Sequence, residues 1–464
     1  MRRFSSTVLR LWFDAEDVPW PKLRAMWLYR AMPVISKLAT HGYYRLTVGG
    51  DALPHDGPVL IVANHSNSLV DPALVVVAAH RTVRFMTKAP LFRHPVIGWL
   101  VRAVGSVPVY RQMDDPKLVS QNFDSFRDVH RAIAEGHAVG IFPEGISHSL
   151  SRLQPLKTGA ARIALGAAKQ LGRAFPIVPM GLVFRDLRVF RSSARVIIGE
   201  SCVWDDLAHR GSEDKEAVRE LTKRIAASML TVTLNLHDWD DEQIVRCAER
   251  VWQAEFGSVA EPLAQMERLQ ATTDALARLR LGESSEWRRV AHELRGHDRM
   301  LARLGFTPLT LNVRVTNEAA VQWVLQRLPI LLLVPLSILG GILFWVPREL
   351  TALAAARLAK AEGEDTIPTF RVLGGAVFFP LWFALLGVLI GYRYGPWIGF
   401  ATACSLPVVA FAALAAGETS RLSIEAARRF FVRRFQRARV AQMRARQSEL
   451  AEKLKELFYA RPAE

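Results

Sequence analysis

A histidine and an aspartate lie six positions apart, directly after an apolar run of the sequence. His65 and Asp71 occur in the segment Ala63 to Pro72, which follows the strand-like residues Pro58 to Val62. Histidine exchanges a proton near neutral pH, and a carboxylate bonded to its other ring nitrogen fixes the tautomer and stabilises the imidazolium that forms. The pair could therefore take the proton from a hydroxyl group.

These residues also have simpler interpretations. Asp71 precedes Pro72, which is the pattern of a helix N-cap followed by proline at the first helical position. An isolated His65 would more often be a structural histidine. A metal-dependent hydrolase could also use the two residues, but no second histidine pair has metal-ligand spacing, so we expect no metal.

Other polar groups follow apolar runs in the same way. Residues 138–142 form a strand-like run that precedes Glu144, Gly145 and Ser147. α/β sheets bind ligands just beyond the carboxyl ends of their strands. Cationic side chains beside other predicted strand ends would suit phosphate oxygens, and these are Lys88 and Arg111.

The segments that must position these groups alternate between strand-like and helical patterns along residues 45–200. Apolar strand-like runs are separated by helical patterns, one of them over residues 159–171. This alternation predicts an α/β fold, with a mixed sheet covered by helices. We expect five parts: an interfacial helical segment (1–44), the α/β domain (45–210), a helical connector (211–320), a membrane region (321–418) and a basic amphipathic cytoplasmic tail (419–464).

Composition points to a membrane protein with anionic partners. The chain has 464 residues, half of them hydrophobic, and a formal net charge of +16. Such a charge favours nucleic acid or anionic lipid headgroups. The long apolar segments favour lipid, so we expect anionic membrane lipids and no nucleic acid. The three cysteines are scattered and fit a reducing compartment.

Three segments without charged residues could each cross a membrane: Leu328 to Pro347, Val372 to Tyr392 and Tyr394 to Gly417. The arginines after the third segment predict a cytoplasmic tail. If the N-terminal domain is also cytoplasmic, the number of crossings is even. We therefore expect the first segment, which contains prolines and a glycine pair, to be re-entrant or in-plane, with three ordinary spans as the alternative.

The arginine-rich tail carries apolar residues at helical spacing: Ile424, Ala427, Phe431 and Phe435. This pattern predicts a helix whose apolar stripe rests on anionic lipid. A nucleic-acid-binding arm is the alternative. The expected location is a bacterial inner membrane or an endoplasmic reticulum, with the α/β domain on the cytoplasmic face.

The polar segments occur in the order of the conserved blocks of the glycerolipid acyltransferase superfamily, which this sequence resembles. The matching segments are 64–71, 88–92, 105–111, 142–149, 156–162 and 177–179. The sequence is most similar to the membrane-bound glycerol-3-phosphate and dihydroxyacetone-phosphate acyltransferase branch. It departs from many relatives in having five residues between His65 and Asp71, and in having Ile146 and His148 in place of threonine and arginine.

The resemblance implies an enzyme that moves an acyl chain from acyl-CoA or an acyl carrier protein to the sn-1 hydroxyl of glycerol 3-phosphate, or also to dihydroxyacetone phosphate. His65 would be the base and Asp71 would orient it. The implied substrate-binding residues are Asn64, Lys88, Arg111, Glu144, Gly145, Ser147 and Lys157. The acyl chain would lie against Val178 and Pro179. No cofactor beyond the thioester co-substrate is expected.

Two other functions stay open at this point. Within the same class of enzyme, the acceptor could be lysophosphatidate or another lysophospholipid. In a different class, a catalytically inactive lipid-binding scaffold would keep the fold, the membrane segments and the basic tail. The presence of both His65 and Asp71 favours the enzyme.

Overall fold

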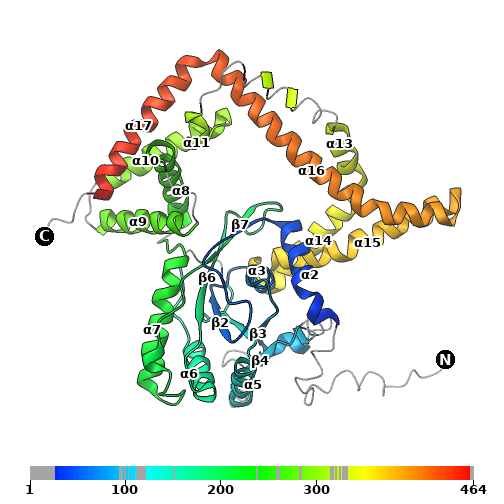
Figure 1. Ribbon diagram of the computed structural model, residues 1–464. Coiled ribbons are helices and arrows are strands. Elements are labelled where there is room, and N and C mark those ends of the chain that lie inside the picture. The colour runs from blue at the N-terminus through cyan, green and yellow to red at the C-terminus, as the bar shows by residue number, and fades with distance from the viewer. Residues whose placement is uncertain are drawn as a thin grey trace. The chain divides into compact units, whose positions relative to one another are not determined.

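The computed structural model describes most of the chain between residues 27 and 459. The described ranges are 27–93, 98, 101–102, 104–110, 122–148, 150, 152–236, 239–257, 262–281, 285–313, 318, 321–322, 325–326 and 333–459. The chain divides into two compact units (Figure 1). We call Met1–His148 with Gln154–Thr233 the sheet unit, and Ser149–Leu153 with Leu234–Glu464 the helical unit.

In the described part of the sheet unit, seven strands form a sheet in the order β1-β7-β6-β2-β5-β3-β4. They are β1 (Arg45–Gly50), β2 (Val59–Ala63), β3 (Val83–Lys88), β4 (Val107–Val109), β5 (Ala138–Ile141), β6 (Ile177–Phe184) and β7 (Ser193–Ile198). Neighbouring strands are parallel except β6 and β7, which are antiparallel. The predicted mixed α/β sheet is confirmed.

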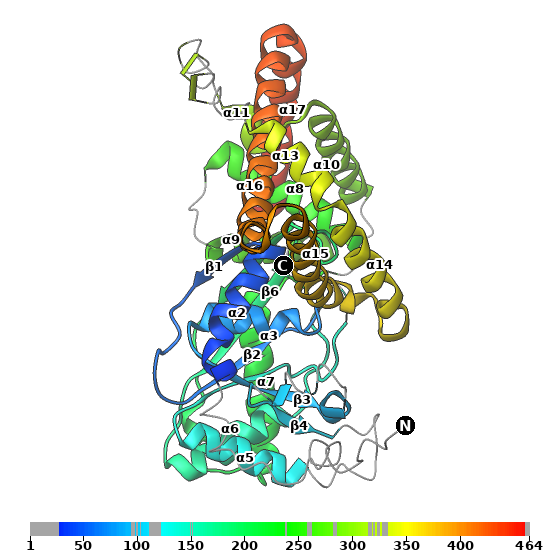
Figure 2. The same ribbon diagram turned by 90° about the vertical axis from the view of Figure 1, so that its right-hand side faces the viewer.

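Helices cover this sheet, so its central strands are buried. Every residue of β2 is buried, as expected for a parallel strand with both faces covered. The helices of the unit are α2 (Trp27–Tyr43), α3 (Val70–Ala79), α5 (Asn122–Ala134), α6 (Gly159–Leu171) and α7 (Lys215–Val232), with 3₁₀ turns η2 (Ala89–Arg93) and η4 (Asp205–Leu207). α5 and α6 lie side by side (Figures 1 and 2).

The parallel strands bring their carboxyl ends to one edge of the sheet. β2 pairs with β5 through Val62 and Ile141, and with β6 through Ala63 and Met180. The segments that follow β2 and β5 therefore leave the sheet side by side. This register places the two most distinctive polar stretches of the sequence next to each other.

The predicted boundary between the α/β domain and a connector differs from the structure. Residues 211–320 were expected to form one connector, but α7 belongs to the sheet unit. Leu221, Ile225 and Met229 on one face of α7 are buried. Their spacing of four residues is that of an amphipathic helix, which must bury its apolar face against another element.

The helical unit contains α8 (Trp239–Phe256), α9 (Pro262–Leu281), α10 (Ser285–Leu304), α11 (Pro308–Asn312), α13 (Val334–Leu343), α14 (Trp345–Glu362), α15 (Ile367–Tyr394), α16 (Pro396–Phe435) and α17 (Arg437–Tyr459). Helices α8, α10 and α17 share a hydrophobic core that includes Val251, Leu294 and Leu450. The C-terminal part of the expected tail is therefore a core helix of this unit, since its apolar side is buried by α8 and α10.

Several arginines of the predicted tail also differ in role. Arg428 and Arg429 donate to the carbonyls of Arg303 and Gly305 at the end of α10, and Arg444 donates to the carbonyl of Leu311 in α11. Arg433 donates to the carbonyl of Thr310. The last carbonyls of a helix lack partners within it, and these side chains supply them.

Among the described residues, two helices are long and apolar enough to cross a membrane, as predicted for the second and third apolar segments. They are α15 and α16, with 28 and 40 residues. The first segment contains α13 and only the beginning of α14, and α13 and residues 345–360 form a pair bent by 55°. Residues 327–332 lie outside the described part. A re-entrant or in-plane course for this segment stays a prediction.

Glycines allow α15 and α16 to approach closely. A Cβ atom on Gly399 would lie 2.4 Å from the carbonyl oxygen of Gly387 and 2.6 Å from the Cα atom of Gly391. Small residues spaced in this way let helix backbones meet in a membrane. The hairpin therefore depends on the absence of a side chain at Gly399.

We predict that Gly399→Leu separates the two helices and lowers the thermal unfolding midpoint of the full chain in detergent. Gly375→Leu on α15 is the matched control, because a Cβ atom there has no neighbour within 4 Å. Overpacking costs about 1–3 kcal/mol. Equal unfolding midpoints for the two variants would contradict the proposed close approach.

Candidate active site

His65 and Asp71 are bonded to each other at the carboxyl edge of the sheet. The Nδ1 atom of His65 lies 2.9 Å from Oδ2 of Asp71. The backbone N–H groups of Ser66 and Asn67 donate to the same oxygen at 2.7 Å each. The Asp71 side chain is fully buried, whereas that of His65 is 19% exposed. Three donors thus hold the carboxylate against one side of the imidazole.

This arrangement leaves the other ring nitrogen of His65 available. A proton on Nδ1 satisfies Asp71, so Nε2 carries the lone pair. Among the described residues, Nε2 has no hydrogen-bonding partner, while Nδ1 is bonded to Asp71. The site can therefore accept a proton at Nε2 and stabilise the resulting positive charge through Asp71.

Asp71 is not the N-cap of the helix that follows. α3 begins at Val70, and its N-cap residue is Leu69, which makes no side-chain cap. The Asp71 carboxylate accepts bonds from residues that precede it, not from the helix after it. Ser68 in the intervening turn has a φ of 39°, a left-handed conformation that is uncommon for a residue other than glycine. The turn aims Asp71 back toward His65.

Aromatic rings fix the plane of the imidazole. The ring of His65 stacks on Phe142 with centroids 4.1 Å apart and an interplanar angle of 14°. Phe142 in turn stacks with Phe85, at 5.8 Å and 8°. A Cβ atom on Gly140 would lie 2.4 Å from the Phe85 ring, so only glycine fits there. Sequence reasoning missed Phe142 and Phe85 because no local pattern signals a stack between strands.

The backbone of His65 is held on both sides by the segment after β5. Its N–H donates to Oε1 of Glu144 at 3.1 Å, and its carbonyl accepts from the N–H of His148 at 3.0 Å. The other oxygen of Glu144 is bonded to Nε2 of His148 at 2.5 Å and accepts from the N–H of Gln154 at 2.7 Å. Glu144 is buried and thus braces the base instead of facing a ligand.

His148 is a residue whose role the sequence left open. Its closeness to Glu144 along the chain was the available signal, because both residues lie in the short segment after β5. Its partner in the structure is the buried carboxylate of Glu144, not solvent. His148, where many relatives have arginine, therefore gives the buried carboxylate of Glu144 a side-chain partner.

Asn64 positions the site from the other side. Its amide donates to the carbonyl of Leu182 at 3.0 Å and accepts from the N–H of the same residue at 2.7 Å. These two bonds tie the end of β2 to β6. Asn64 was expected to contact substrate. Because the nitrogen and the oxygen of its side-chain amide are both bonded to backbone, it positions the site instead.

A tyrosine anchors the turn between the base and its carboxylate. Asn67 donates to the hydroxyl of Tyr44 at 2.8 Å, and that hydroxyl donates to the carbonyl of Leu187 at 2.5 Å. Burial raises the pKa of Tyr44 well above its usual value, so the hydroxyl stays protonated and can donate. No sequence pattern links Tyr44 with Asn67, which are 23 positions apart.

The other residues predicted to bind substrate differ in how the structure places them. Ser147 accepts a bond from the N–H of Ser68 at 3.4 Å. Gly145 has a φ of 78°, and the side chain of Lys157 lies 3.4 Å from where its Cβ atom would be. Lys88 ends β3 and is exposed, as is Lys157. Arg111 lies outside the described residues. In the described part of the chain, no cluster of potential metal ligands occurs.

A small apolar cavity lies beside the turn that carries Asp71. Its volume is about 90 Å³, and its walls come from α2, α3, β3 and residues 101–106. Leu69 and Pro72 line it from either side of Asp71, and Phe85 lines it from β3. Val178 and Pro179 are buried in β6 and are not among its described lining residues. Their expected contact with an acyl chain stays a prediction.

Several known proteins are similar to parts of this chain. The Acyltransferase family model matches residues 45–183. A glycerol-3-phosphate O-acyltransferase of Saccharomyces cerevisiae is 28% identical over 291 residues, which are 58% of this chain and 38% of the yeast protein. A chloroplastic 1-acyl-sn-glycerol-3-phosphate acyltransferase of Brassica napus is 29% identical over 150 residues, 32% of this chain and 40% of that protein.

A solved 1-acyl-sn-glycerophosphate acyltransferase of Thermotoga maritima is 19% identical, with a TM-score of 0.34, and the match covers 49% of this chain and 86% of that one. The chain spans about two fifths of the length of the yeast and Brassica relatives. The family match runs from the start of β1 almost to the end of β6 and so contains His65, Asp71 and Glu144. Residues 45–183 therefore form an acyltransferase domain.

Proposed function

We propose that this protein is a membrane-bound O-acyltransferase that moves a fatty acyl chain from an acyl thioester to the sn-1 hydroxyl of glycerol 3-phosphate. The observation that carries the proposal is the bond between His65 and Asp71, which leaves Nε2 of the histidine open within an acyltransferase domain. The similarity to a yeast glycerol-3-phosphate O-acyltransferase supports this acceptor. The donor is acyl-CoA or an acyl carrier protein.

The reaction needs one proton to move twice. Nε2 of His65 takes the proton of the acceptor hydroxyl as that oxygen attacks the thioester carbonyl carbon. The tetrahedral intermediate collapses, the carbon–sulfur bond breaks, and the imidazolium returns the proton to the leaving thiolate. Asp71 stabilises the imidazolium between these steps. The oxygen–carbon bond of the ester replaces the carbon–sulfur bond, and the enzyme forms no covalent intermediate.

Cationic and polar groups near the site suit the phosphate of the acceptor. Lys88 and Lys157 are exposed, and Lys157 lies over the left-handed turn at Gly145. Ser147 lies close to the turn that follows His65. We infer that these three residues, with Arg111, bind the acceptor's phosphate. A lysine attracts phosphate as a point charge, whereas the arginine can bind it through two parallel hydrogen bonds.

The apolar cavity suits the end of the acyl chain. It is smaller than the roughly 150 Å³ cavity that can hold benzene, so its volume of about 90 Å³ admits only a few carbons. Leu69, Pro72 and Phe85 connect its wall to the His65 and Asp71 pair. We infer that it receives part of the chain while the thioester lies near Nε2.

The second candidate is transfer to lysophosphatidate, or remodelling of another lysophospholipid, which the similarity to the Brassica enzyme supports.

Two candidate membrane-spanning helices would place the sheet unit and the arginine-rich segment on one side of the membrane. We infer that this side is the cytoplasmic face of a bacterial inner membrane or an endoplasmic reticulum.

Thiol release from a long-chain acyl thioester tests the acceptor. We predict that the full chain in lipid turns over with glycerol 3-phosphate, and more slowly with dihydroxyacetone phosphate. Turnover with lysophosphatidate alone would replace the first candidate by the second. An absence of thiol release with all three acceptors would favour the inactive scaffold.

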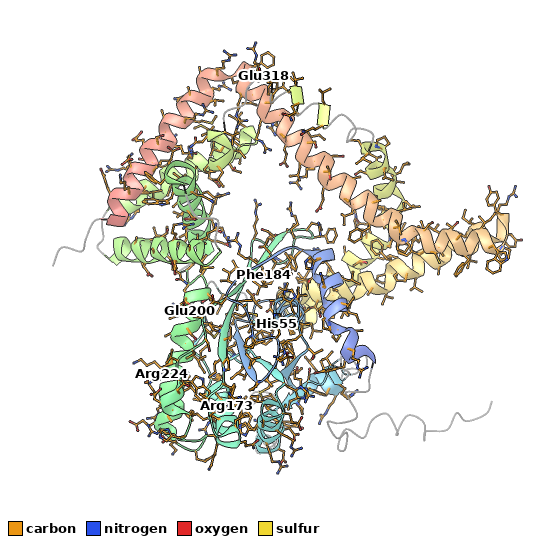
Figure 3. The ribbon with its side chains drawn as sticks, viewed as in Figure 1. His55, Arg173, Phe184, Glu200, Arg224 and Glu318 are labelled. Atoms are coloured by element: carbon orange, nitrogen blue, oxygen red, sulfur yellow. The ribbon has the colours of Figure 1, made fainter. Side chains whose placement is uncertain are left out.

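Substitution of the base tests the mechanism. We predict that His65→Ala lowers the turnover rate by about 100-fold or more, because a general base contributes roughly 10²–10⁴. His55→Ala is the matched control, since His55 is an exposed histidine before β2 (Figure 3). Thermal unfolding of both variants checks that the fold is kept. Turnover of His65→Ala within a few-fold of the unsubstituted enzyme would exclude the proposed base.

A larger side chain in the cavity should shorten the acyl chains that the enzyme accepts. We predict that Ala73→Phe, which fills space lined by α3, lowers kcat/KM for long-chain thioesters more than for short-chain thioesters. Val203→Phe is the control, because Val203 is exposed and is not among the described lining residues. An unchanged chain-length profile would mean that the acyl chain binds elsewhere.

A further inference from the structure

Asn235 lies in the connection between α7, which ends at Val232, and α8, which begins at Trp239 (Figure 1). Its side-chain oxygen accepts a hydrogen bond at 2.9 Å from the backbone N–H of Leu153. Leu153 belongs to no helix or strand, and a backbone N–H outside such elements needs another acceptor. Asn235 therefore fixes the backbone of an irregular segment that is 82 positions away along the chain.

The residue after Leu153 bonds to the carboxylate that holds the base. The N–H of Gln154 donates to Oε2 of Glu144 at 2.7 Å, and Oε1 of Glu144 accepts from the N–H of His65 at 3.1 Å. Each hydrogen bond in this series lies within one of the two compact units, and the chain itself joins them at Leu153 and Gln154. The φ and ψ angles of Leu153 separate its N–H from that of Gln154. The bond to Asn235 therefore restricts the direction in which Gln154 donates.

The segment from His148 to Gln154 begins and ends at the same carboxylate. Nε2 of His148 is bonded to Oε2 of Glu144 at 2.5 Å, and the same oxygen accepts from the N–H of Gln154. Glu144 is buried, and a buried carboxylate that loses a donor is destabilised. Loss of the Gln154 bond would therefore move Glu144 toward its other partners and displace the peptide of His65.

A further backbone bond limits this displacement. The N–H of Lys157 donates to the carbonyl of Pro143 at 2.7 Å, and this bond does not involve Asn235. The chain after Gln154 therefore stays beside Glu144 when the Asn235 side chain is removed. We expect a partial loss of alignment, not unfolding of the segment.

We propose that Asn235 is a positioning residue for acyl transfer, which aligns His65 through the carboxylate of Glu144. The inference rests on the proposed function, because it concerns the step in which Nε2 of His65 takes the proton of the acceptor hydroxyl. Asn235 acts on the geometry of the base and not on substrate. Its loss therefore lowers kcat and leaves the KM values of thioester and acceptor unchanged.

Steady-state thiol release by the full chain in lipid tests this role. Asn235→Ala removes the acceptor of the Leu153 N–H, whereas Asn235→Asp keeps an acceptor oxygen at that position. Asn312→Ala is the matched control, because Asn312 is also a half-buried asparagine, and it bonds to the carbonyl of Ala254 and to Glu255 within the helical unit. Thermal unfolding checks that each variant folds.

We expect Asn235→Ala to lower kcat about tenfold, since a displacement of about 1 Å can cost roughly 100-fold and the Lys157 bond limits it. The KM values should change less than about twofold, Asn235→Asp should recover most of the rate, and Asn312→Ala should match the unsubstituted chain. In a Glu144→Gln background, Asn235→Ala should lower kcat less than about twofold further, because both residues act through one series of bonds.

Three results would overturn the positioning role. They are a kcat of Asn235→Ala equal to that of Asn312→Ala, a loss confined to KM, and a full tenfold further loss in the Glu144→Gln background. The first would show that Asn235 does not act on the base. The other two would show that it acts on substrate binding or by a route that does not include Glu144.

Amide hydrogen exchange separates failure of this inference from failure of the proposed function, because exchange needs no turnover. The N–H of His65 is bonded to Glu144, so Asn235→Ala should speed its exchange several-fold and Asn312→Ala should not. An absence of thiol release from the unsubstituted chain would refute the proposed function, and faster exchange at His65 would still show the link from Asn235. Unchanged exchange at His65 in Asn235→Ala would overturn the inference whether or not the chain releases thiol.

Discussion

The site depends on how the peptide of His65 is held. Its N–H and its carbonyl are both bonded to the segment from Glu144 to His148, while its ring is bonded to Asp71 and stacked on Phe142. A displacement of about 1 Å can cost roughly 100-fold in rate. The hydrogen bonds between the ends of β2 and β5 therefore matter as much to the chemistry as the imidazole itself.

Holding the peptide of His65 in this way requires the buried carboxylate of Glu144, and the structure supplies hydrogen-bonding partners for that carboxylate. A buried charge that loses its partner costs several kcal/mol. Glu144 has the N–H groups of His65 and Gln154 and the ring of His148. These three contacts fix the carboxylate of Glu144 and, through it, the peptide of His65.

The sequence predicted what depends on strand order and local pattern. The helix expected over residues 159–171 coincides with α6, and the polar segments after β2 and β5 meet as expected for parallel strands. The bond from Tyr44 to Asn67 and the stack on Phe142 could not be predicted, because they join residues whose separation along the chain carries no periodic signal. The contacts of the arginines in the predicted tail differ from the prediction for a related reason. Their acceptors are carbonyls more than 100 positions away, and basic spacing alone resembles a lipid-binding pattern.

The β6–β7 loop and the active site share structural links. Tyr44 donates to the β6–β7 loop and accepts from Asn67, whose backbone N–H donates to Asp71. Asn64, the residue before His65, is bonded to Leu182 in β6, the strand that leads into the same loop. A shift of this loop would therefore act on the histidine and on its carboxylate through separate bonds. Because one bond holds the residue before the base and the other holds the turn that carries its carboxylate, the position of the loop and the alignment of the base are mechanically coupled.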